Sequence, residues 1–158
     1  MEQNWYPAIA DLVRNGSAAE SADALAALVG AAVRHEGTCL IAFHPERTPE
    51  VLHHTLEPEG ASHYLDRYLA GPYLLDPLYQ LTQARRKPGI CRYRDTAPDR
   101  FRSSEYYRHY CEQTHLTDEI DYLVDVGSGT TAVLVVGRRT RRFSRAEVGH
   151  LEALADTV

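Results

Sequence analysis

Residues 62–88 bring together four tyrosines and two aspartates. Tyr64 and Tyr68 are spaced by one helical turn, so on a helix they would project from the same face. Tyr73 and Asp76 follow close behind. Phenol rings can cover the apolar body of a small molecule, while hydroxyls and a carboxylate bind its polar end. The spacing therefore predicts a binding site for a small organic ligand.

Asp76 also has a simpler interpretation. It stands directly before Pro77, and an aspartate followed by proline is an ordinary helix N-cap that needs no ligand. The two roles are compatible, because one carboxylate oxygen can cap the helix while the other faces a cavity. The sequence is consistent with the capping role, the ligand-binding role, or both.

Helical and strand periodicities predict the elements that would position these residues. We expect helices over about 5–13, 21–34, 103–114 and 144–158, and two more within 62–88 that are separated at Gly71-Pro72. We expect strands over 38–43, 51–57, 119–126 and 130–137. The continuously apolar strand 130–137 is expected at the centre of the sheet and strand 51–57 nearer an edge. This order predicts one α+β domain over 1–158, a central antiparallel sheet with helices on both faces.

Two further tyrosines belong to the candidate site. Tyr93 lies in an irregular crossover over residues 88–98, and such segments often close a pocket. Strand 119–126 alternates, which places Tyr122 on an apolar face and Glu119 and Asp121 on a polar one, so a half-buried strand is expected. The candidate ligand-binding residues are Tyr64, Tyr68, Tyr73, Asp76, Tyr93 and Tyr122.

The order Tyr64, Tyr68, Tyr73, Asp76-Pro77 resembles the acyl-homoserine-lactone-binding (autoinducer, quorum-sensing) domain of LuxR-type transcription regulators. There an aromatic pair precedes an Asp-Pro dipeptide. The downstream segments 94–107, 118–119 and 143–147 look more like the divergent GAF-like sensor domains found ahead of LuxR-type helix-turn-helix modules. The resemblance covers roughly 62–158. It implies a GAF/PAS-like α/β/α sandwich that senses a small molecule, forms a homodimer and controls an attached DNA-binding domain.

The chain departs from the autoinducer pattern in three places. Tyr64 stands where autoinducer domains usually carry tryptophan, and the only tryptophan is Trp5. Arg92 and Tyr93 occupy the crossover, where a further aromatic is usual. The late strand is wholly aliphatic over 132–136 and lacks the small hydroxyl residue that faces the ligand amide. We therefore expect an unassigned small organic ligand, with an acyl-homoserine lactone as a candidate but not the favoured one.

The composition of the chain limits which kinds of partner it is expected to bind. The formal net charge is -5 and the pI is near 5.9, which argues against phosphate binding to DNA by this chain alone. After Gly149 only nine residues follow, too few for a helix-turn-helix, so DNA binding is expected only through a C-terminal domain absent from this chain. No signal peptide is visible and no apolar run approaches the roughly 20 residues that cross a bilayer. We expect a cytoplasmic protein without a membrane partner, dimerising through the alanine-rich helix 21–34 or the C-terminal helix.

Catalytic chemistry finds little support. The eight histidines lack metal-ligand spacing, so neither a metal, a cofactor nor an enzymatic activity is expected. Two alternatives remain. Cys91 lies beside Arg92 and Arg94, whose charges favour a thiolate, and with Cys39 or Cys111 as partner it would fit a GAF-like thiol-dependent reductase. The third hypothesis is a dimerisation module without a ligand.

Overall fold

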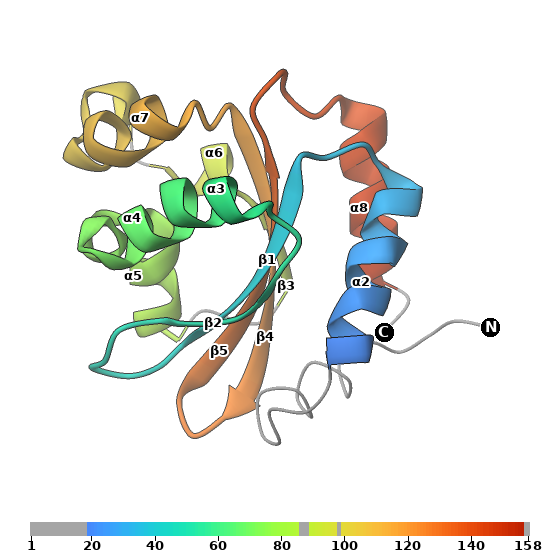
Figure 1. Cartoon of the computed structure of the whole chain (residues 1–158), viewed down its shortest axis with the longest axis horizontal. Coiled ribbons are helices and arrows are strands. Elements are labelled where there is room, and N and C mark those ends of the chain that lie inside the picture. The colour runs from blue at the N-terminus through green and yellow to red at the C-terminus, as the bar shows by residue number, and fades with distance from the viewer. Residues whose placement is uncertain (1–18, 86–88, 98, 157–158) are drawn as a thin grey trace.

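The computed structural model describes residues 19–85, 89–97 and 99–156. They form a five-stranded antiparallel sheet with helices on both faces, which confirms the expected α+β sandwich (Figure 1). The helix expected over 5–13 lies outside the described residues. The longer elements are α2 (Ala19–Ala32), β1 (Gly37–Phe43), β2 (Glu50–His54), α5 (Pro77–Gln83), β3 (Gly89–Arg92), β4 (Asp118–Gly127), β5 (Thr130–Arg138) and α8 (Arg145–Asp156). The short helices are α3 (Pro58–Ala61), α4 (Arg67–Leu69), α6 (Tyr93–Thr96) and α7 (Glu112–Thr114).

The strands follow one another in the sheet in the order β2-β1-β5-β4-β3. Strand β5 is central and β2 lies at an edge, as predicted. Strand β3 was not predicted, because residues 88–98 were expected to be irregular. It has only four residues and pairs Ile90 with Tyr122 of β4. A strand that short, beginning at Gly89 with φ of 146°, carries too little periodicity to be recognised from sequence.

Helices cover both faces of the sheet (Figure 1). On one face α2 and α8 pack against apolar side chains that include Leu40, Ile120 and Val136. The helices from α3 to α7 pack on the other face, against a cluster that includes Ile41 and Val133. One sheet therefore separates two apolar cores.

This double cover corrects the expectation for strand β4. Glu119 and Asp121 were expected on a polar, solvated face, but both are buried, with Asp121 fully enclosed. Alternation correctly separates them from Ile120 and Tyr122. It does not reveal that the helices between β3 and β4 cover the face with the acids.

The segment with the tyrosines is helical with a break, as predicted. Helix α3 continues through a π-helical turn at Ser62–Asp66 into α4, and the helix ends at Leu69, shortly before Gly71, whose φ is 149°. A 3₁₀ turn at Pro72–Leu75 leads into α5. A second π-helical turn, Tyr107–Cys111, precedes α7, which ends at Thr114.

Candidate functional site

Asp76 performs two tasks with its two carboxylate oxygens. Its Oδ1 accepts a hydrogen bond from the Leu78 backbone N–H at 2.8 Å, which caps α5. Its Oδ2 accepts from the Tyr68 hydroxyl at 2.6 Å. Asp76 is 2% exposed, and burial raises its pKa to about 6 although the Tyr68 hydroxyl and the Leu78 N–H oppose the rise. The carboxyl is thus held rigidly in an apolar setting.

A cavity of about 80 Å³ lies beside this pair, between the sheet and the helices that carry the tyrosines. Tyr64, Tyr68 and Asp76 line it, so the structure brings three of the six candidate residues to one place. The mostly apolar walls include Ile41, Phe43, Leu65, Leu78 and Val135. Whether these residues bind a ligand stays a prediction.

The other three candidates lie elsewhere. Tyr73 packs its ring against Tyr68, with centroids 6.2 Å apart, and does not line the cavity. Tyr93 is buried against Phe101, with ring centroids 5.2 Å apart, and borders a different hollow.

Tyr122 lies on the opposite face of the sheet, where its hydroxyl donates to the Leu151 carbonyl oxygen of α8 at 2.7 Å. The physical reason is the alternation of strand β4. Tyr122 shares a face with Ile120 and therefore points toward α8, away from Asp76.

The cavity-lining residues that sequence reasoning missed include Tyr106, Tyr110, Thr114 and Glu119. Tyr106 and Tyr110 stack with ring centroids 5.4 Å apart, and Tyr110 donates to the Tyr64 carbonyl oxygen at 3.3 Å. Their spacing of one helical turn was a usable signal, the same one that singled out Tyr64 and Tyr68.

Glu119 adds a second carboxyl to the cavity wall. Burial, and after it the nearby Asp76, raise its pKa to about 8. Burial and the neighbouring Glu119 raise the pKa of Asp121 well above its ordinary value. Both shifts favour the protonated form of these buried carboxyls, the form in which Glu119 offers a ligand a hydroxyl donor as well as an acceptor.

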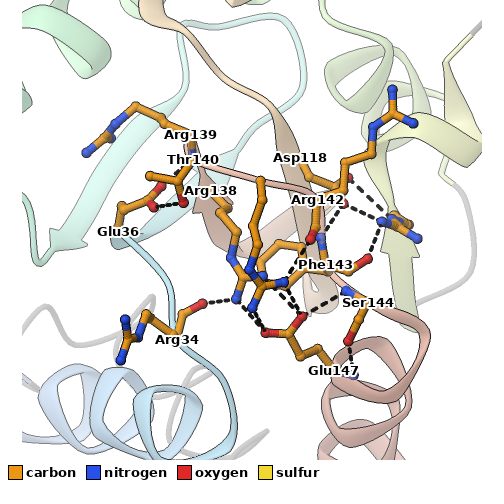
Figure 2. Close-up of polar contacts among 12 residues, drawn as sticks. Arg34, Glu36, Asp118, Arg138, Arg139, Thr140, Arg142, Phe143, Ser144 and Glu147 are labelled. Carbon is orange, nitrogen blue, oxygen red and sulfur yellow. Dashed lines mark hydrogen bonds and ion pairs between the residues drawn. The ribbon is translucent and has the colours of Figure 1, made fainter.

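Arginine side chains close the other end of the cavity. Arg139 lies over the Tyr64 ring, 4.7 Å from its centroid, and both residues line the cavity. The adjacent Arg138 is buried behind it and points toward α8, where it meets Glu147 (Figure 2). Arg138, which contacts α8, and Arg139, which lines the cavity, are thus consecutive residues at the end of β5.

Two of the three cysteines, Cys39 and Cys111, show no sign of activation. All three are buried. Burial raises the pKa of Cys39 to about 12, and burial also raises that of Cys111. Reactive thiols show the opposite shift. Among the described residues no cluster of three or more His, Cys, Asp or Glu side chains could hold a metal ion.

Comparison with known proteins gives matches by structure alone, since no family model and no curated protein sequence matches the chain. The ligand-binding domain of VqsR from Pseudomonas aeruginosa superposes with a TM-score of 0.71 at 23% identity, over 98% of this chain and 96% of that one. The N-acylhomoserine-lactone-dependent LuxR-family transcription factor CepR2 from Burkholderia cenocepacia gives 0.62 at 16% identity, over 99% and 90%. The chain has the fold of a LuxR-type ligand-binding domain.

The GAF domain of the cyanobacteriochrome TePixJ shares the LuxR-type fold more distantly. Its TM-score is 0.52 at 14% identity, over 85% of this chain and 81% of that one. The expected likeness to autoinducer-binding and GAF-like domains is confirmed at the level of fold. None of the helices in the described part of the chain has the length and apolar character that a bilayer crossing requires.

Proposed function

We propose that this domain is the sensing part of a LuxR-type transcription regulator and that a small organic ligand binds in the cavity beside Asp76. The observation that carries the proposal is the buried Tyr68–Asp76 pair in the wall of an apolar cavity. A carboxyl fixed by two hydrogen bonds in such a setting discriminates strongly between ligands, because an unmatched buried polar group is costly. The fold supports the sensing role, since solved proteins that share it include ligand-binding domains.

The cavity restricts the ligand. Its volume of about 80 Å³ is small beside the roughly 300–1,000 Å³ of typical ligand sites. Either the ligand is compact or the walls move apart when it enters, and Arg139 over Tyr64 is the contact that would open. A long acyl chain requires such an opening, so an acyl-homoserine lactone remains a candidate and not the favoured ligand.

A binding screen tests the proposal. Short-chain acyl-homoserine lactones and small phenolic amides would be titrated into the chain, with thermal stabilisation and calorimetry as readouts. A ligand of the site should lose affinity in Asp76→Asn, by about 1–3 kcal/mol if it donates to the carboxyl. A hit whose affinity is the same in Asp76→Asn would place the ligand elsewhere.

We also propose that the domain forms a homodimer and acts on DNA only through a further domain. Helices α2 and α8 lie together on the face of the sheet away from the cavity (Figure 1), which leaves them available for a two-fold contact. Light scattering at tens of micromolar tests this, and a monomer there contradicts it.

A second candidate is a dimerisation module that binds no ligand. The small cavity volume favours it. It predicts that no compound in the screen stabilises the folded chain, although light scattering shows a dimer.

A further inference from the structure

A second hollow, here called the arginine groove, lies between α6, the start of β4 and the loop after β5. Its volume is about 470 Å³, within the range of small-molecule sites. Four arginines line it: Arg94, Arg100, Arg102 and Arg142. Leu116 and Glu119 line both this groove and the cavity beside Asp76. The other lining residues of the two hollows differ. The proposed ligand of that cavity does not account for the arginine groove.

The positive charge of the arginine groove is not neutralised from within the chain. In the part of the chain that the structure describes, no hydrogen bond or ion pair joins the four guanidinium groups to another residue. In Figure 2 the Arg142 side chain extends away from Glu147. Four cations therefore line one hollow of a chain whose formal net charge is -5.

The acids at the base of the groove do not cancel this charge. Arg92 is ion-paired with Asp118, whose Oδ2 also accepts the Phe143 backbone N–H at 2.9 Å. Glu119 is buried, and burial raises its pKa, which favours its uncharged form. The groove therefore presents guanidinium groups to an incoming anion with little competition.

Aromatic rings also line the groove. Phe101 and Tyr107 both line the groove and meet edge to face, with ring centroids 5.5 Å apart. A guanidinium group can bind a phosphate through two parallel N–H···O hydrogen bonds, and aromatic rings stack on planar ligand groups. A hollow that offers both suits a ligand that joins a phosphate to a ring.

We propose that the arginine groove binds a phosphorylated small molecule with a planar ring, of which a nucleoside diphosphate is the simplest representative. The arginines hold the phosphates and Phe101 with Tyr107 contacts the ring. The inference is independent of the proposed sensor ligand, since the four arginines lie outside the cavity beside Asp76.

Calorimetric titration of the chain with pyrophosphate and with adenosine diphosphate tests the proposal. Both should bind, the nucleotide more tightly. The double variant Arg100→Gln/Arg102→Gln should weaken both by about tenfold or more, because each arginine contributes charge-assisted hydrogen bonds. Phe101→Leu should weaken only the nucleotide. These arginines are exposed, so the variants should keep the fold, which circular dichroism checks.

Arg47→Gln is the matched control. Arg47 is an exposed arginine in the connection between β1 and β2 and does not line the groove. Its loss removes one positive charge, as each of the two arginine substitutions in the groove does, and it should leave both affinities unchanged. Three results would overturn the proposal: no binding of either probe at millimolar concentration, equal weakening in Arg47→Gln, or full binding by the double variant. Equal affinity for the two probes would overturn the part assigned to the rings.

Discussion

Arg138 of β5 and Glu147 of α8 form a two-point ion pair, with Nη1–Oε2 and Nη2–Oε1 distances of 3.2 and 3.0 Å. The Arg138 side chain is 2% exposed and lies over the Phe143 ring, while its guanidinium also donates to the Arg34 carbonyl oxygen (Figure 2). Arg141, Arg138 and the Ser144 backbone N–H together hold the pKa of Glu147 well below its usual range. The pair fastens α8 to the end of the central strand.

Removing this carboxylate should destabilise the fold. Glu147→Gln leaves the buried Arg138 cation without its counter-charge, and we expect a loss of about 3 kcal/mol in the free energy of unfolding. Urea denaturation measures it. Glu152→Gln removes an exposed acid from the same helix and should change the unfolding free energy by less than about 0.5 kcal/mol. Equal effects of the two variants would contradict the assigned role of the pair.

Stability should fall as pH rises from about 5 to about 8, in part because of Glu119. Its folded pKa of about 8 exceeds the ordinary value, so its contribution is complete below the unfolded pKa and is lost as pH rises through the folded one. Glu119→Gln should therefore flatten the profile of urea midpoint against pH. An unchanged slope in the variant would show that Glu119 is ionised in the folded chain.

The Tyr68 hydroxyl should matter more than that of its neighbour. Tyr68→Phe removes the 2.6 Å hydrogen bond to Oδ2 of the buried Asp76 and should cost about 1–3 kcal/mol of unfolding free energy. Tyr73→Phe is the control, because Tyr73 is only half-buried and packs through its ring. Thermal unfolding compares the two. Equal shifts in Tm would mean that the Tyr68–Asp76 bond contributes nothing specific.

Ligand affinity should distinguish the two faces of the sheet. Tyr122→Phe removes the bond to the Leu151 carbonyl oxygen and should lower stability, yet leave ligand affinity unchanged. Tyr68→Phe should lower both. Calorimetry with any compound that binds the cavity measures the difference, and a loss of affinity in Tyr122→Phe comparable to that in Tyr68→Phe would place the ligand on the α8 side.

Local signals in the sequence predicted most of the framework. Ser144 and Glu147 form a capping box at the start of the helix expected over 144–158, with Ser144 N–H to Glu147 Oε2 at 2.8 Å and Glu147 N–H to Ser144 Oγ at 3.2 Å. The central position of the apolar strand β5 and the helix break at Gly71 were also predicted from the sequence. Each depends on residues close in sequence, which is why each could be recognised without the fold.

The site was harder to predict because it depends on which face of the sheet is covered, and by what. The alternation of side chains along β4 predicts that Tyr122 and Glu119 point to opposite faces of the sheet. It does not predict which face holds the cavity. Charge suggested that Glu119 is solvated, and the aromatic helix around Tyr106 that buries it is separate from β4 in sequence. Asp76 was identified because its capping role and its contact with Tyr68 both arise within nine residues.

The two π-helical turns, Ser62–Asp66 and Tyr107–Cys111, each precede or contain residues of the cavity wall. A π turn accommodates one residue more than the α-helical repeat, so loss of a single codon at His63 would let the helix return to regular hydrogen bonding. Because a π turn absorbs its extra residue locally, the helix on either side would keep its orientation, and only side chains within the turn, such as Tyr64, would be redistributed. Backbone regularity and the aromatic wall are therefore opposed here, and a genetic screen for folded but unresponsive mutants should return deletions at these two turns.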